Sequence, residues 1–147
     1  LVQATVIDSW GANVNVKIPV TNTKKEFTGS LIKELSAAGI QLNITAVFTP
    51  MQVRGIAENL SHDTPAIVSV FAGRIADTGR DPVPIMRECV EILKDFPKAE
   101  LLWASPRELL NIIQADEVGC HIITATPNIL EKLESLVEFV FVLVMQL

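Results

Sequence analysis

The chain has 147 residues, of which 49% are hydrophobic and 20% are charged, and its formal net charge is −5 at pH 7. This composition predicts one globular domain over residues 1–147 and excludes an intrinsically disordered chain. The acidic balance leaves no basic stripe that could meet phosphate groups, which argues against a nucleic-acid partner.

Cysteine spacing and hydropathy exclude further classes of protein. Two cysteines, Cys89 and Cys120, are too few for a disulfide framework, and no Cys or His spacing indicates a metal site. The N-terminus lacks the basic region and apolar run of a signal peptide, and the longest apolar run, 139–145, is too short to span a bilayer. We therefore expect a cytoplasmic protein with no metal and no membrane contact.

Residues 13–19 alternate between polar and apolar side chains, which predicts a strand with two different faces. Residues 1–10 before it resemble the end of a helix closed at Gly11, so the chain is expected to begin in the middle of a fold. The strand should end at Pro19, which cannot donate to a ladder, with Lys17 near its C-terminal end. Burial favours the neutral form of a lysine, and a free amine can attack a carbonyl to form a Schiff base. The alternative is a lysine that reaches into solvent from a strand end.

The next segment predicts a helix, a strand and a second helix. The first helix runs from 24 to 38 with Phe27 on the same stripe as Leu31 and Leu35, and the strand covers residues 40–48. Thr49-Pro50 opens the second helix, because a hydroxyl caps the first amides and proline follows where no amide hydrogen is needed.

The rest of the chain repeats this alternation. We expect a strand at 66–72, a glycine-containing loop at 73–82, a helix at 83–96, strands at 99–104 and 120–125, and a short helix to about residue 136. Two more cap-and-proline pairs, Ser105-Pro106 and Thr126-Pro127, should each open a helix, the first carrying Leu109, Leu110 and Ile113. Residues 138–147 are predicted to form an apolar strand that breaks the alternation, and this tail has no assignment.

Five strands that alternate with helices predict an α/β fold with a parallel sheet. No GxGxxG or GxxxxGK[ST] run follows a strand, so a doubly wound nucleotide fold is disfavoured. Polar residues recur instead at the C-terminal ends of the strands, where ligands bind in a (β/α)₈ barrel. They are Lys17, Asn43, Thr45, Ser69, Ser105 and Thr126. Five strands cannot close such a barrel, so we expect a partial one.

Four short motifs resemble the transaldolase family, which includes small fructose-6-phosphate aldolase-like proteins. The motifs are Val16-Lys17-Ile18-Pro19, Asn43-Ile44-Thr45, Ser69-Val70-Phe71-Ala72-Gly73-Arg74 and Ala104-Ser105-Pro106-Arg107, and the resemblance covers about residues 13–133. It implies strands four to eight of a (β/α)₈ TIM barrel of the class I aldolase type, with Schiff-base chemistry and no cofactor. The N-terminal strands of the family, which carry its acidic proton-transfer residue, have no counterpart here.

The resemblance also implies roles for single residues. Lys17 would form the Schiff base, Thr45 would hold a catalytic water, and Asn43 would donate hydrogen bonds to substrate hydroxyls. Ser69 and Phe71 would face the barrel centre, and Arg74, Ser105 and Arg107 would bind a phosphate, helped by free amides at a helix start. The alternatives are ordinary buried polar residues for Asn43 and Thr45, core packing for Phe71, and solvated surface arginines.

The implied function is a transaldolase that transfers a dihydroxyacetone unit between sugar phosphates in pentose phosphate metabolism. A fructose-6-phosphate aldolase-like lyase and a non-catalytic sugar-phosphate-binding remnant are the alternatives. No aspartate or histidine offers a convincing substitute for the absent proton donor; Asp77, for example, falls in a predicted loop. Small members of the family form rings, so a homo-oligomer also stays open.

Overall fold

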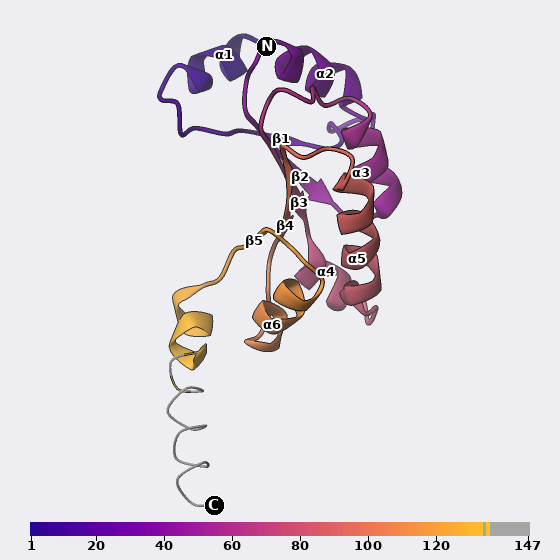
Figure 1. The fold of residues 1–147 in the computed structure, drawn as a ribbon, viewed down its shortest axis with the longest axis vertical. Coiled ribbons are helices and arrows are strands. Elements are labelled where there is room, and N and C mark those ends of the chain that lie inside the picture. Colours follow the sequence, from indigo (N-terminus) through magenta and orange to yellow (C-terminus); the bar gives the residue numbers. More distant parts are fainter. Residues whose placement is uncertain (134, 136–147) are drawn as a thin grey trace, which may run out of the picture.

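The computed structural model describes residues 1–133 and 135, which form a parallel sheet with helices against one face (Figure 1). The strands are β1 (Val16–Pro19), β2 (Leu42–Val47), β3 (Ala66–Val70), β4 (Ala99–Trp103) and β5 (Ile122–Ile123). All of their pairings are parallel, and their order in the sheet is β1-β2-β3-β4-β5. A doubly wound sheet would reverse its order part-way, whereas a barrel adds each strand beside the last. The predicted partial (β/α)₈ barrel is therefore confirmed.

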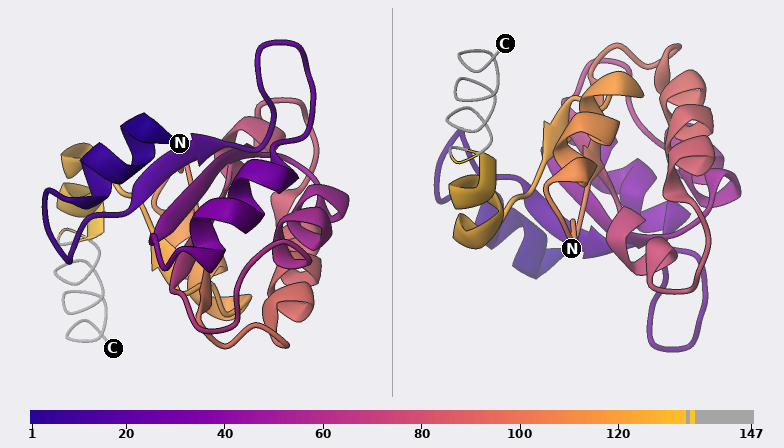
Figure 2. Two further views of the ribbon diagram at one scale, coloured as in Figure 1. Left: turned by 90° about the horizontal axis from the view of Figure 1, so that it is seen from above. Right: turned by 90° about the horizontal axis from the view of Figure 1, so that it is seen from below.

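The helices between the strands make the crossovers. They are α1 (Val2–Asp8), α2 (Gly29–Ala37), α3 (Pro50–Ala57), α4 (Ala72–Ala76), α5 (Pro82–Leu93) and α6 (Leu110–Glu117), and residues 127–133 are also helical. Figure 1 shows α2, α3 and α5 side by side along one face of the sheet, and Figure 2 shows the same layer from above and below. No helix in the described part of the chain is long and apolar enough to cross a membrane.

The core lies between the sheet and these helices, because strand residues alternate between its two faces. In β1, Val16 and Ile18 are buried against the helices while Lys17 is exposed. The helices contribute the buried side chains of Ile32, Leu35, Val53, Ile56, Met86 and Cys89, which pack in one cluster with the apolar strand residues. Each such side chain contributes about 1.5–3 kcal/mol of transfer free energy. Burial therefore fixes which strand side chains face the helices and which face away.

The start of α3 forms as its local sequence predicts. Thr49 Oγ1 accepts a hydrogen bond from the Gln52 amide (3.2 Å), and Gln52 Oε1 accepts one from the Thr49 amide (3.2 Å). This reciprocal pair is a capping box, and Pro50 occupies the first helical position. The prediction of a helix opened by Thr49-Pro50 is confirmed.

The predicted helix over 24–38 begins later, at Gly29. Asn22 Oδ1 accepts hydrogen bonds from the amides of Lys24 (2.9 Å) and Glu26 (3.0 Å), and Lys25 has a φ of 65°. An asparagine that binds the next amides in this way holds a turn and competes with helix formation. Phe27 consequently lies in the loop, bridged to Thr21 and 46% exposed, and the prediction that it shares the helical stripe was wrong.

The predicted loop at 73–82 is wrong in its first part, because α4 spans Ala72–Ala76. Strand β3 accordingly ends at Val70 rather than at residue 72. The turn follows α4 at Gly79, whose φ of 80° lies in the left-handed region that glycine enters without steric cost.

The helix expected directly after Ser105-Pro106 begins only at Leu110. Leu110 and Ile113 are 50% and 41% exposed, so they do not form the buried face, which instead carries Asn111 and Ala115. Strands β1 and β5 are shorter than the predicted 13–19 and 120–125. The predicted strand at 138–147 lies outside the described residues.

Candidate functional site

A cavity of about 260 Å³ lies at the C-terminal ends of the strands, on the face away from α2, α3 and α5. It gathers predicted site residues from β1, β2 and β3 and from the segments that follow β3 and β4, which are Lys17, Asn43, Thr45, Ser69, Phe71 and Ser105. Leu102, Ala104 and Thr124 complete the lining. Parallel strands bring their C-terminal ends to one edge of a sheet, so residues far apart in the sequence meet there. Arg74 and Arg107 do not line this cavity.

Lys17 stands on β1 beside Asn43 of β2, its partner in the strand register. Its side chain is exposed, on the face opposite Val16 and Ile18. The described residues therefore do not supply the burial that the sequence led us to expect around the amine. They do place the amine beside polar groups that can bind a substrate.

Asn43 and Ser69 are joined across neighbouring strands. Ser69 Oγ donates a hydrogen bond to Asn43 Oδ1 at 2.7 Å, and Ser69 is buried. The amide oxygen of Asn43 is thus occupied, which leaves its Nδ2 hydrogens as donors toward the cavity. Two residues predicted separately therefore act as one hydrogen-bonded pair.

Thr45 is aimed by an irregularity in β2. The pairing of β2 with β3 shifts register between Ile44 and Val47, and Ala46 has a φ of 59°. A bulge of this kind bends a strand and re-aims the side chains around it. Thr45 Oγ1 is buried and has no hydrogen-bond partner among the described residues. A buried hydroxyl without a partner is costly, so it suits a site that takes up a water or a ligand group.

Phe71 forms the apolar wall of the cavity. Its ring meets that of Phe48 edge to face, with the centroids 5.5 Å apart. The Arg74 guanidinium lies over the Phe71 ring, 4.7 Å from the ring centroid. The stacking holds an exposed cation next to a cavity-lining side chain.

Arg107 is bound by Asp77 rather than left free. Its Nε donates to Asp77 Oδ1 (3.0 Å) and Oδ2 (3.1 Å), and its Nη2 donates to Oδ2 (2.5 Å). The hydrogen bonds from Arg107 are the largest influence and lower the pKa of Asp77; desolvation opposes them, and the charges of Arg107 and Arg74 lower the pKa further. The same hydrogen bonds raise the pKa of Arg107. A carboxyl held in this way is ionised at neutral pH and is a poor proton donor.

The loop before α6 has a different structure from the predicted helix start. Ser105 has a φ of 59°, and a Cβ placed on Gly73 would lie 1.5 Å from its carbonyl oxygen. The amides of Arg107 and Glu108 donate to Asn111 Oδ1 at 2.7 and 3.2 Å. The expected helix start directly after Pro106 is therefore absent, because α6 begins only at Leu110, and the two amides that follow Pro106 are bound by Asn111.

Sequence reasoning missed the structural parts that Asp77 and Asn111 play. Asp77 follows Arg74 by three residues, the spacing at which two side chains share a helix face. We predicted a loop for this segment, so the helical spacing was not considered. Asn111 is 6% exposed, and a buried asparagine in a helix needs polar partners. Its position four residues after Arg107 was the available signal.

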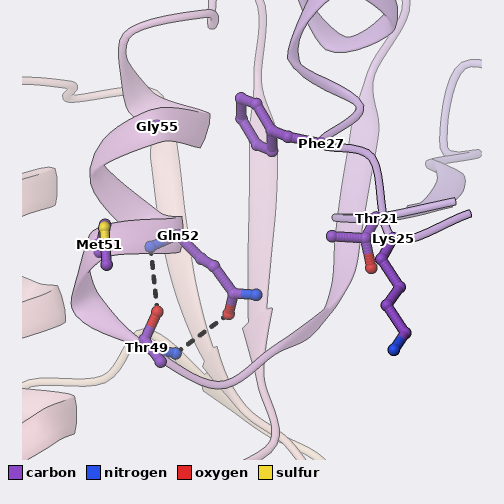
Figure 3. Close-up of a pocket in the computed structure, with 7 residues that line it drawn as sticks. All are labelled: Thr21, Lys25, Phe27, Thr49, Met51, Gln52 and Gly55. Carbon is purple, nitrogen blue, oxygen red and sulfur yellow. Dashed lines mark hydrogen bonds between the residues drawn. The ribbon is translucent and has the colours of Figure 1, made fainter.

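A second pocket of about 380 Å³ lies beside the loop after β1 and the start of α3 (Figure 3). In Figure 3 the Phe27 ring lies near Gly55 of α3, and the capping box of Thr49 and Gln52 lies at the start of the same helix. Thr21 and Lys25 lie across from the capping box. The predicted site residues do not line this pocket.

Comparison with known proteins identifies the family. The family described as Transaldolase/Fructose-6-phosphate aldolase matches residues 1–138. The chain belongs to this family. Proteins named probable transaldolase are similar to it: that of Nitrosopumilus maritimus is 33% identical over 126 residues, which are 84% of this chain and 53% of the relative. That of Streptococcus pyogenes is 34% identical over 133 residues, 89% of this chain and 58% of the relative.

The chain spans a little over half the length of the relatives it matches, since a probable transaldolase 2 of Listeria monocytogenes is also covered to 58%. The range matched by the transaldolase/fructose-6-phosphate aldolase family contains every residue of the cavity. The parallel sheet in chain order is consistent with a partial TIM barrel of this family.

Proposed function

We propose that this chain is a transaldolase-like enzyme that transfers a dihydroxyacetone unit between sugar phosphates through a Schiff base on Lys17. The observation that carries the proposal is the cavity that gathers Lys17, Asn43, Thr45 and Ser69 at one edge of a partial barrel. Membership of the transaldolase/fructose-6-phosphate aldolase family supports it.

The proposed reaction begins when the neutral Lys17 amine adds to the ketose carbonyl and water leaves, which gives an iminium ion. A base removes the proton of the hydroxyl on the β-carbon, two bonds from the iminium carbon, and a carbonyl forms there as the bond between the α- and β-carbons breaks. The electron pair of that bond moves into the iminium to form an enamine. The aldehyde fragment departs. The enamine then attacks an acceptor aldehyde, and hydrolysis of the new iminium frees Lys17.

The polar neighbours of Lys17 can serve these steps. Ser69 occupies the oxygen of Asn43 at 2.7 Å, so the Asn43 amide hydrogens are oriented as donors to substrate hydroxyls. The buried Thr45 hydroxyl could bind the water that leaves and returns. Neither side chain needs to change its charge for these roles.

The phosphate of the substrate would lie at the rim of the cavity. Ser105 lines the cavity, Arg74 lies over the lining residue Phe71, and Arg107 follows Ser105 by two residues. Arginine binds phosphate oxygens through paired N–H groups and stays charged at any working pH. We assign the phosphate to these three residues.

The exposure of Lys17 favours a second candidate, a chain that binds sugar phosphates without turnover. A lysine that acts as a nucleophile is usually desolvated by its surroundings, and the described residues do not enclose Lys17. A lyase that releases the dihydroxyacetone unit instead of transferring it would use the same first steps, so borohydride trapping does not distinguish a lyase from a transferase. Adding an acceptor aldehyde distinguishes them, because only a transferase requires the acceptor to take up the dihydroxyacetone unit.

Borohydride trapping tests the proposal. With fructose 6-phosphate present, we expect reduction to leave a covalent adduct on Lys17, read by mass spectrometry of the digested chain. Lys17→Met should abolish the adduct, whereas Lys24→Met, which alters an exposed loop lysine, should leave it unchanged. Binding of fructose 6-phosphate without an adduct on Lys17 would contradict the enzyme and support the non-catalytic candidate.

A further inference from the structure

We propose that Asp77 is a positioning residue that fixes the guanidinium of Arg107 for the substrate phosphate. This inference rests on the proposed function, because it assigns a task to a residue next to the proposed phosphate site. The Asp77 carboxylate and the Arg107 guanidinium form an ion pair between the end of α4 and the loop that follows β4.

The ion pair occupies only one edge of the guanidinium. Asp77 accepts hydrogen bonds from Nε and Nη2 of Arg107, at 2.5 to 3.1 Å. A guanidinium has five N–H donors in a planar fork, so its Nη1 edge stays available to a second anion. The carboxylate therefore sets the plane and direction of the fork without using all of it.

One short segment holds both proposed phosphate arginines. Arg74 stacks on Phe71 at 4.7 Å, and Asp77 binds Arg107, so residues 71–77 order one guanidinium at each end of α4. The charge of Arg74 also acts on Asp77. The three groups together carry a formal charge of +1, which favours binding of an anion.

The segment that carries Asp77 is itself fixed against the loop that carries Arg107. The Gly73 amide donates to the Ala104 carbonyl at 3.2 Å, and the Gly73 Cα packs directly on the Ser105 carbonyl oxygen. Asn111 binds the Arg107 amide at 2.7 Å. Arg107 is therefore held at its backbone and at its head group.

A long exposed side chain that is already held in place loses less conformational freedom when it binds a ligand. Arg107 is 46% exposed as a side chain, so without Asp77 it would sample many rotamers. The opposite effect also exists, because the negative charge of Asp77 repels a phosphate, but solvent screens this repulsion between exposed groups. We therefore expect the gain in orientation to outweigh the repulsion.

Calorimetric titration of the whole chain with fructose 6-phosphate and with fructose tests the assignment. Asp77→Ala should weaken binding of fructose 6-phosphate roughly tenfold and leave binding of fructose unchanged. Asp77→Asn should weaken it less, because one acceptor oxygen remains, and Asp77→Glu should restore most of the affinity. In the background of Arg107→Ala, removal of Asp77 should have no further effect.

Three results would overturn the inference while Arg107→Ala still weakens binding of the phosphorylated sugar. The first is tighter binding of fructose 6-phosphate after Asp77→Ala, which would make Asp77 a competitor of the phosphate. The second is unchanged affinity for fructose 6-phosphate, and the third is an equal loss of affinity for fructose 6-phosphate and fructose. If Arg107→Ala itself changes nothing, or if the unaltered chain binds no fructose 6-phosphate, the proposed phosphate site fails as well, and the inference fails with it. Circular dichroism of each variant confirms that the exposed substitution leaves the fold intact.

Discussion

Gly73 is the residue at which two parts of the site come into contact. Its Cα faces the Ser105 carbonyl oxygen so closely that any Cβ would overlap it, at 1.5 Å. The contact is between backbones, so no side-chain rotation can relieve it. This close approach places α4, with Arg74, next to the loop that carries Arg107.

We expect Gly73→Ala to destabilise the chain by on the order of 3 kcal/mol, because a methyl group has no space and the backbone must move. Urea unfolding measures the loss. Gly79→Ala is the matched control: its φ of 80° is unfavourable for alanine, but nothing lies within 4 Å of the added Cβ. That control should cost about 1–2 kcal/mol. A cost for Gly73→Ala no larger than for the control would show that the two backbones are not held in contact.

At the scale of single elements, the same dipeptide signal led to different structures. Thr49-Pro50 opens α3 with a complete capping box. Ser105-Pro106 does not open a helix, because Ser105 is in the left-handed region and α6 begins at Leu110. An N-cap residue needs an extended backbone, which Thr49 has at φ −133° and ψ 150°. The local pattern was therefore sufficient only where no tertiary contact opposed it.

We expect Thr49→Ala to lower the free energy of unfolding by about 1 kcal/mol, because the Gln52 amide loses its acceptor at the start of α3. The midpoint of urea unfolding gives the change. Thr23→Ala, in the exposed loop before α2, should stay within about 0.5 kcal/mol of the unaltered chain. Equal midpoints for the two variants would mean that the cap contributes nothing to stability.

For the molecule as a whole, the sheet has two outer strands. Within the described residues β1 pairs only with β2, and β5 only with β4. The amides of Val16 and Val20 point toward β2, at 2.8 and 2.9 Å from their acceptors. Successive strand amides point to opposite edges, so the amides of Asn15 and Lys17 point away from β2. Pro19 occupies the next such position, where its missing N–H removes no hydrogen bond to β2.

Unpaired edge amides favour pairing with another strand. We expect the 147-residue polypeptide in isolation to associate at micromolar concentration, with a scattering mass above 16.1 kDa. Asn15→Pro removes an edge amide that points away from β2, so it breaks no bond within the sheet and should reduce the association. A monomer at every concentration tested would contradict this expectation.

Part of this site could be predicted from the sequence, because strand alternation is a local property. The period of two places Lys17 opposite Val16 and Ile18, and the same rule applies to Asn43 and Ser69, whatever the rest of the chain does. The residues of the cavity follow from these faces and from parallel strands whose C-terminal ends meet at one edge. The resemblance of four short motifs to the transaldolase family led to the same residues, and the family is confirmed.

Other features depended on contacts between segments that lie far apart in the sequence. The partner of Arg107 is 30 residues away, and the conformation of Ser105 goes with the approach of Gly73 from another crossover. The exposure of Lys17 depends on what covers its face of the sheet, which its own strand cannot specify. The sequence by itself determined which face each strand residue takes, because neighbouring peptide units enforce that alternation. Only the tertiary structure decided which charges and backbones meet, because those contacts exist only after the crossovers have packed.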